Sequence, residues 1–195
     1  MNKHLYPRID YKPEELAYLN SPKTHKLWER IAYYIKNHNS KKLVDIGCST
    51  GYINNFLIDY KYQYYGIDQS PYLVDEAIKK WHNDDIRFEL GNWNMSTTNV
   101  ECDCLLLLGV LPYGISEYGY EENISPWELY NKFITKYNPT QIIIKETCKI
   151  QNGIELDLKT VNLEPFLEIA DNVEYINVDT ILGNKVLINV TRKRT

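Results

Sequence analysis

Hydrophobic positions along the chain follow two alternating patterns: short apolar runs, and longer segments with apolar residues at helical spacing. The apolar runs, each bounded by turn residues, lie at 43–46, 62–68, 86–90, 102–109 and 141–146. The helical segments lie at 13–19, 22–39, 71–81 and 126–134. Short strands that alternate with helices predict a mostly parallel sheet with helices on both of its faces.

The C-terminal part of the chain has a different pattern. Residues 155–171 predict a mixed helix around Pro165, and the segments 173–181 and 185–191 alternate as strands. The pair Gly183-Asn184 between those strands is a two-residue hairpin signal. We therefore expect a doubly wound α/β sheet that ends in an antiparallel hairpin.

Composition narrows the class of protein. With 195 residues, 44% of them hydrophobic, the chain is long enough for one three-layer domain. The net charge of −4 and the absence of a basic half argue against extended nucleic-acid binding. No signal-peptide pattern or membrane-length apolar run occurs in the sequence, which predicts a cytoplasmic protein with no membrane partner. The four cysteines are expected to be reduced thiols without a metal.

The segment 43–57 carries the strongest functional signal. Its apolar strand ends in a turn with glycine at 47 and 51, and an amphipathic helix is predicted to begin near Tyr52. A strand, a glycine turn and a helix in this order form the first half of a nucleotide-binding unit, in which the ligand lies directly on the main chain. An ordinary strand-to-helix turn without a ligand is the alternative, because short glycine patterns also occur by chance.

The spacing of the glycines separates two kinds of nucleotide site. A dinucleotide fingerprint that starts at Gly47 requires glycine at positions 49 and 52, where this chain has Ser49 and Tyr52. The pattern D-x-G-x-x-x-G from Asp45 instead resembles motif I of the class I S-adenosylmethionine-dependent methyltransferases, with Ser49 in place of the middle glycine. A nicotinamide-dependent oxidoreductase remains an alternative that this spacing disfavours.

A carboxylate follows at the distance expected for a ribose contact. Asp68 ends the second apolar run, about 20 residues beyond the glycine turn, where an acid can accept from both ribose hydroxyls. Ser70-Pro71 follows it as a helix N-cap and first helical residue. The order of these features matches the resemblance, which implies a seven-stranded sheet whose last strand runs antiparallel.

The resemblance also implies positions for the adenine and for the methyl group. Asn92 offers hydrogen bonds to the adenine edge, and Trp93 offers a stacking face. The run 102–113 resembles motif IV, at the strand end where the methyl group meets its acceptor. The residues expected around the cofactor are Asp45, Gly47, Cys48, Ser49, Gly51, Asp68, Gln69, Asn92, Trp93, Leu108 and Gly109.

The sequence says less about the acceptor. Amino-methyltransferases carry (D/N)-P-P-(Y/F) in motif IV, whereas this chain has Val110-Leu-Pro-Tyr113, a form closer to small-molecule O-methyltransferases. The resemblance thus implies transfer of a methyl group from S-adenosylmethionine to a small-molecule oxygen, with S-adenosylhomocysteine as product. An N-methyltransferase of RNA or protein, and a methyltransferase-like domain that binds without turnover, remain alternatives. Candidate catalytic residues, from their strand-end position, are Tyr113, Glu117 and Glu146.

Two domain-level predictions complete the picture. Residues 1–20 are expected to be an N-terminal arm or a lid over the substrate, and residues 21–195 the single cofactor-binding domain. The loop from Tyr113 to Glu122 leaves the central strand at its carboxyl end, where ligands bind in open α/β sheets. Both the arm and this loop are rich in tyrosine, so together they are predicted to form the acceptor pocket.

Overall fold

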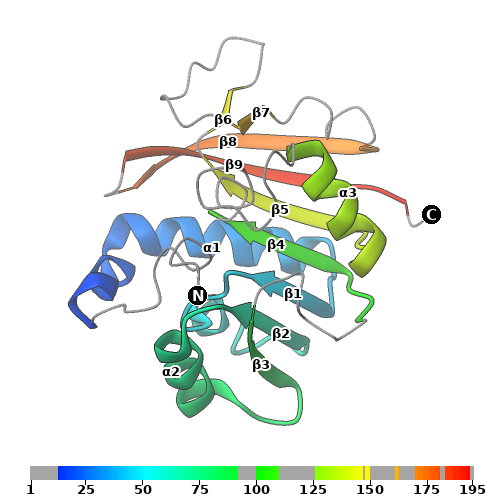
Figure 1. Cartoon of the computed structure of the whole chain (residues 1–195). Helices are drawn as coiled ribbons and strands as arrows, with labels where there is room; N and C mark the ends of the chain where they lie inside the picture. Colours follow the sequence, from blue (N-terminus) through cyan, green and yellow to red (C-terminus); the bar gives the residue numbers. More distant parts are fainter. Residues whose placement is uncertain are drawn as a thin grey trace, which may run out of the picture.

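The chain forms one seven-stranded sheet with helices on both faces (Figure 1). The computed structural model describes residues 13–91, 100–109, 126–146, 148–149, 161–162, 170–180 and 183–193. The strands of the sheet are β1 (Lys42–Ile46), β2 (Gln63–Asp68), β3 (Ile86–Leu90), β4 (Cys104–Leu108), β5 (Gln141–Glu146), β8 (Asn172–Thr180) and β9 (Gly183–Thr191). Their order is β3-β2-β1-β4-β5-β9-β8, with β1 to β5 parallel and β9 antiparallel to both neighbours. The predicted doubly wound sheet with a terminal hairpin is confirmed.

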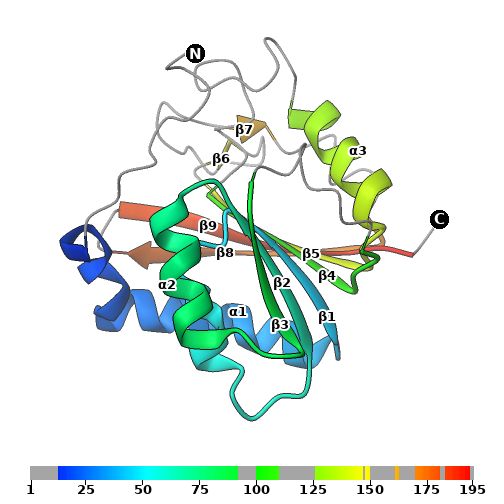
Figure 2. The same ribbon diagram turned by 60° about the horizontal axis from the view of Figure 1, so that its bottom comes forward.

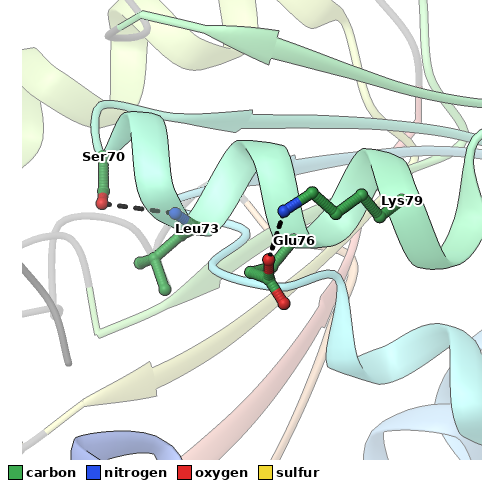
Figure 3. A network of polar contacts seen from close by, with 4 residues as sticks. All are labelled: Ser70, Leu73, Glu76 and Lys79. Atoms are coloured by element: carbon green, nitrogen blue, oxygen red, sulfur yellow. Dashed lines mark hydrogen bonds and ion pairs between the residues drawn. The ribbon is translucent and has the colours of Figure 1, made fainter. Parts of the chain in front are cut away.

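The helical elements are η1 (Pro13–Asn20), α1 (Pro22–Asn37), η2 (Tyr52–Phe56), α2 (Pro71–Trp81) and α3 (Pro126–Tyr137). The predicted cap at Ser70 is present, since its hydroxyl accepts from the Leu73 amide at 3.4 Å, and the Ser21 hydroxyl caps α1 in the same way by accepting from the Thr24 amide at 3.1 Å. The capped start of α2 is drawn in Figure 3. Each cap satisfies a backbone donor that the first helical turn leaves free, so Ser-Pro fixes where both helices begin.

Alternate residues of the central strands fill two separate cores. One core packs Val44, Leu105 and Ile142 against Phe133 and Tyr137 of α3. The other packs the opposite face of the strands against the apolar side of α1. Figure 2 shows α1 and α3 on opposite sides of the sheet. Strands buried on both faces are expected to be continuously apolar, which explains the run of leucines in β4.

The order of the strands reverses between β1 and β4. β2 and β3 lie to one side of β1, and β4 and β5 lie to the other, with β1 and β4 paired in parallel from Leu43 and Cys104. The chain therefore leaves the carboxyl ends of these two strands in opposite directions. In open α/β sheets, the crevice at such a reversal is the place where ligands bind.

The prediction of an amphipathic α-helix beginning near Tyr52 is wrong, because η2 is a five-residue 3-10 helix. Two asparagine side chains compete with helical hydrogen bonding: Asn54 donates to the Gly51 carbonyl and Asn55 to the Tyr52 carbonyl. The Leu57 amide bonds to the carbonyl of Asn54, three residues back rather than four. Side chains that occupy nearby backbone carbonyls favour turns over a continuous α-helix.

Two C-terminal predictions also need correction. The hairpin turn is not at Gly183-Asn184, because these residues pair with Thr180 and Asp179 inside the ladder of β8 with β9. Within the predicted helix 155–171, Val161–Asn162 form the short strand β7, which pairs in parallel with β6 (Cys148–Lys149). The remaining residues of 155–169 lie outside the described residues.

Among the described residues, no helix is long and apolar enough to cross a membrane. Cys48, Cys102 and Cys104 are buried.

Candidate cofactor site

Three residues of the turn after β1 have a left-handed backbone conformation. Gly47, Ser49 and Gly51 have φ angles of 71°, 52° and 65°. A Cβ on Gly51 would lie 2.8 Å from the Phe88 ring and 3.0 Å from the Asn54 amide nitrogen, so this position admits only glycine. Ser49 holds the same conformation despite its side chain, which is uncommon for a residue other than glycine. The turn is therefore tightly constrained by the residues beneath it.

Asp68 fastens this turn to the end of β2. Its Oδ2 accepts from the Ser49 amide at 2.8 Å, and its Oδ1 accepts from the Ser70 amide at 2.9 Å. The Asp68 carbonyl accepts from the Gly91 amide, which joins the end of β3 to the same point. Burial raises the pKa of the Asp68 carboxyl, and these amide donors oppose the rise. Asp68 thus joins the end of β2 to the turn after β1 through its carboxylate, and to the end of β3 through its carbonyl.

A second carboxylate lies buried beneath the turn. Asp45 is 2% exposed, and its Oδ2 accepts from the Tyr64 hydroxyl at 2.7 Å, while its Oδ1 has no hydrogen-bond partner among the described residues. Burial raises the pKa of Asp45 to about 7; the Tyr64 hydrogen bond and the Lys145 ammonium act in the opposite direction. The acceptor capacity of this carboxylate is thus only half used.

The far wall of the site is the end of β4. Leu108 is paired with Lys145 of β5 in the sheet, and Gly109 follows it with a φ of 93°. A Cβ on Gly109 would lie 3.5 Å from the Lys145 ammonium, so that side chain lies alongside the end of β4. Gly109 and Gly47 therefore follow the two strands between which the order of the sheet reverses.

The remaining predicted site residues are placed as follows. Cys48 is buried, and its side chain packs against Gly66. A Cβ added to Gly66 would lie only 2.8 Å from the Cys48 sulfur. Gln69 follows Asp68, and within the described part of the chain its buried Oε1 has no hydrogen-bond partner. Glu146 is the last residue of β5, although its side chain lies outside the described part of the chain. The other predicted residues, Asn92, Trp93, Tyr113 and Glu117, lie outside the described residues, and their roles stay predictions.

The site meets two requirements for a nucleoside ligand with hydroxyl or ammonium donors. Each oxygen of Asp68 accepts one backbone amide, which leaves acceptor capacity on both. Two buried oxygens, Asp45 Oδ1 and Gln69 Oε1, find no partner in the segments that the structure describes, and both belong to residues predicted for this site. Buried acceptors of this kind are costly unless a partner reaches them, so they favour a ligand rich in donors.

Two residues at the site were not predicted from the sequence. Tyr64 supplies the only hydrogen bond to Asp45 that the described residues show, and Lys145 lies beside Gly109. The signal for Lys145 was available, because a lysine that ends a buried apolar strand must have its charge at the strand end. The signal for Tyr64 was weaker, because it lies opposite Leu43 in the register and reaches Asp45 two residues further along.

Comparisons with known proteins identify the fold. No family model matches the sequence, and no curated protein matches it. The structure is similar to the N-methyltransferase NodS from Bradyrhizobium japonicum WM9 in complex with S-adenosyl-l-homocysteine, with a TM-score of 0.69 and 14% identity over 95% of this chain and 94% of that one. It is also similar to magnesium protoporphyrin IX methyltransferase from Synechocystis PCC 6803 with bound SAH, with a TM-score of 0.65 and 12% identity over 88% and 84% of the two chains.

A third similar structure is a putative O-methyltransferase from Nostoc punctiforme PCC 73102, with a TM-score of 0.65 and 12% identity over 91% of this chain and 59% of that one. The strand order and the antiparallel β9 agree with this similarity. The predicted fold is therefore confirmed: the chain has the fold of the class I methyltransferases.

Proposed function

We propose that the protein is an S-adenosylmethionine-dependent methyltransferase. The observation that carries the proposal is the bond between the Ser49 amide and the Asp68 carboxylate, at the carboxyl ends of β1 and β2. This bond holds the turn, in which three residues have a left-handed backbone conformation, against Asp68. Asp68 lies where a carboxylate that binds the ribose hydroxyls is expected. The similar structures that contain S-adenosylhomocysteine support the same ligand class for this chain.

In this proposal, the described residues hold the cofactor from three sides. Asp68 accepts from the ribose hydroxyls, and the backbone of 47–51 provides the surface on which the amino-acid part lies. Gly109 lets the cofactor approach the main chain at the end of β4, since any side chain there would be strained. The cofactor supplies an activated methyl group on a positively charged sulfur. The protein must align the acceptor with that group and exclude water.

We propose a small molecule with an oxygen nucleophile as the acceptor. The support is the sequence Val110-Leu-Pro-Tyr113, which lacks the two residues that amino-methyltransferases place at the exocyclic amine. The fold does not favour oxygen over nitrogen as the acceptor atom. At comparable TM-scores, one similar protein is named an N-methyltransferase and another a putative O-methyltransferase. A nitrogen acceptor is therefore the second candidate.

Activity with labelled cofactor tests the proposal. The protein is incubated with S-adenosylmethionine carrying a deuterated methyl group, together with pools of small hydroxyl compounds, small amines, and bulk RNA. Mass spectrometry then shows which pool gains the label. We expect label in the hydroxyl pool, and at least about tenfold less of it with the Asp68→Asn variant when the cofactor is well below saturation. Label only in amines or RNA would overturn the oxygen assignment, and folded protein that binds no cofactor would overturn the function itself.

A further inference from the structure

A recess lies on the flank of the glycine turn, between η1, the start of η2 and α2. Its volume is about 360 Å³, which lies within the range of small-molecule sites. The lining residues come from all three elements and from the turn: Leu16, Leu19, Asn20, Thr50, Tyr52, Glu76, Lys79 and Lys80. None of the individual residues predicted to hold the cofactor is among them, and Thr50 is the one residue of the turn at 47–51 that lines the recess.

The charged wall of the recess has an excess of one positive charge. Lys79 and Lys80 bring two ammonium groups, and Glu76 brings one carboxylate. Figure 3 shows the Glu76 and Lys79 side chains meeting along α2, with 2.7 Å between the ammonium nitrogen and the carboxylate oxygen. These side chains are 41% and 71% exposed, so the ion pair is weak and both groups can reorient toward a ligand.

Lys80 is held more firmly than Lys79. Its ammonium donates to the Asn55 side chain at 3.2 Å and lies 4.5 Å above the centre of the Trp81 ring. These contacts restrict the rotamers of a side chain that would otherwise be mobile, so less entropy is lost when an anion binds. The recess therefore contains one positioned cation and one adjustable cation.

The opposite wall combines an apolar surface with neutral polar groups. Leu16 and Leu19 of η1 provide the apolar part. The Tyr52 hydroxyl is 2.9 Å from His25 Nε2 and 3.4 Å from Asn20 Oδ1. Burial raises the pKa of Tyr52, which keeps its hydroxyl neutral and available for hydrogen bonding. An occupant thus meets leucines on one side and cations on the other.

The recess is also joined to the glycine turn. Thr50 lines the recess and stands between Ser49 and Gly51, and its carbonyl accepts from the Trp81 indole nitrogen at 3.1 Å. Trp81 in turn lies beneath the Lys80 ammonium. A molecule in the recess would therefore change the surroundings of the Thr50 backbone and of the Trp81 indole, and both groups report on binding.

We propose that this recess binds a small organic acid: a carboxylate near Lys79 and Lys80, with a short apolar body against Leu16 and Leu19. The proposal rests on the lining of the recess and does not depend on the methyltransferase assignment. The net positive wall selects an acid over an amine of the same shape, and the leucines select an acid with an apolar body over an inorganic anion.

The test is a nitrogen-15 NMR titration of the cofactor-free, full-length protein with hexanoate. We expect saturable shifts at the Thr50 amide and the Trp81 indole. The double variant Lys79→Gln/Lys80→Gln should weaken hexanoate binding at least about fivefold, because both cations at the carboxylate are lost. The matched control is Lys26→Gln/Lys36→Gln, two exposed lysines of α1 away from the recess, which should bind hexanoate like the parent.

Two further probes test the selection by charge and by shape. Hexylamine has the same body with the opposite charge and should give no saturable shift, and inorganic phosphate should bind more weakly than hexanoate. Absence of saturable hexanoate shifts at Thr50 and Trp81 would overturn the proposal. The proposal would also be overturned if hexylamine bound as tightly as hexanoate. The same holds if the double variant, shown to be folded by its spectrum, bound hexanoate as tightly as the parent protein.

Discussion

The Ser49 amide donates to the Asp68 carboxylate at 2.8 Å, across the gap between the turn after β1 and the end of β2. The two residues are 19 positions apart in the sequence, and parallel pairing of β1 with β2 brings them together. The bond explains how Ser49 holds a left-handed conformation that glycine normally occupies. A charged acceptor offsets the backbone strain, which is of order 1–2 kcal/mol for a residue with a side chain.

Asp68→Asn should separate the role of the charge from that of side-chain size. The amide cannot accept on both sides, so one of the amides of Ser49 and Ser70 loses its partner, at a cost of about 1–3 kcal/mol in the free energy of unfolding. Affinity for S-adenosylhomocysteine should fall at least about tenfold, because two charge-assisted bonds to the ribose are weakened. Denaturant unfolding and calorimetric titration measure the two effects.

The control for this variant is Asp59→Asn, which changes an exposed aspartate in the turn after η2. It should leave both stability and affinity close to those of the parent protein. If Asp68→Asn binds as tightly as the parent while folded, the ribose lies elsewhere and the site must be reassigned.

Gly51→Ala should destabilise the protein far more than Gly91→Ala. At Gly51 the φ of 65° is strained for alanine, and the new Cβ would meet the Phe88 ring at 2.8 Å. At Gly91 the nearest atom, Glu89 Oε1, would lie at an ordinary 3.7 Å. We expect a loss of about 2 kcal/mol or more at Gly51 and less than about 1 kcal/mol at Gly91. Equal melting temperatures for the two variants would contradict the conformation of the turn.

The raised pKa of Asp45 predicts that stability depends on pH. The pKa of Asp45 in the fold is about 7, above the 3.8 of an unperturbed aspartate, so the folded state binds the proton more tightly than the unfolded state does. This contribution to stability is complete below about pH 4 and is lost as the pH rises toward 7. Asp45→Asn stays neutral, so its stability should fall less than that of the parent protein over this range.

Tyr64→Phe provides the complementary test. Removing the hydroxyl leaves the buried Asp45 carboxylate without its one described hydrogen bond. The loss of stability should be larger at pH 8, where the carboxylate is charged, than at pH 5, where it is protonated. The coupling free energy between Tyr64 and Asp45 is obtained from the unfolding free energies of Tyr64→Phe, Asp45→Asn and the double variant, each measured at the two pH values. A penalty independent of pH would show that Asp45 does not titrate in this range.

The sequence was sufficient to predict the sheet, because alternation of strands and helices constrains the topology strongly. It also located Gly47, Gly51 and Asp68 at one place, because parallel strands bring their carboxyl ends to one edge. It failed at η2, where the apolar pattern of Ile53, Phe56 and Leu57 suits an α-helix, but asparagine side chains occupy the carbonyls that such a helix needs.

The hairpin turn shows another limit of the sequence. Gly183-Asn184 is a strong local turn signal, yet the ladder of β8 with β9 continues through both residues. Register is decided by which side chains reach the core, and Val186 and Ile188 are both fully buried. The pairing of Tyr64 with Asp45 was unpredictable for a similar reason, since it depends on side-chain direction across two strands.

Deletion of residues 1–12 should leave cofactor binding within a few-fold of the parent value. Residues 13–20 must be kept, because Leu19 is buried and Asn20 contacts Tyr52. If the arm helps to cover the acceptor, methyl transfer should fall much more than cofactor affinity, because alignment and exclusion of water are lost. Transfer at the parental rate by the shortened protein would show that residues 1–12 take no part in the acceptor pocket.

The central claim is that the turn at 47–51 and Asp68 form a site for S-adenosylmethionine and not for a dinucleotide. Isothermal titration calorimetry of the protein with S-adenosylhomocysteine, and separately with NAD, tests it most directly. We predict one S-adenosylhomocysteine bound per chain, with NAD at least about a hundredfold weaker, a difference of about 2.8 kcal/mol. Tight NAD binding with no heat from S-adenosylhomocysteine would contradict the account.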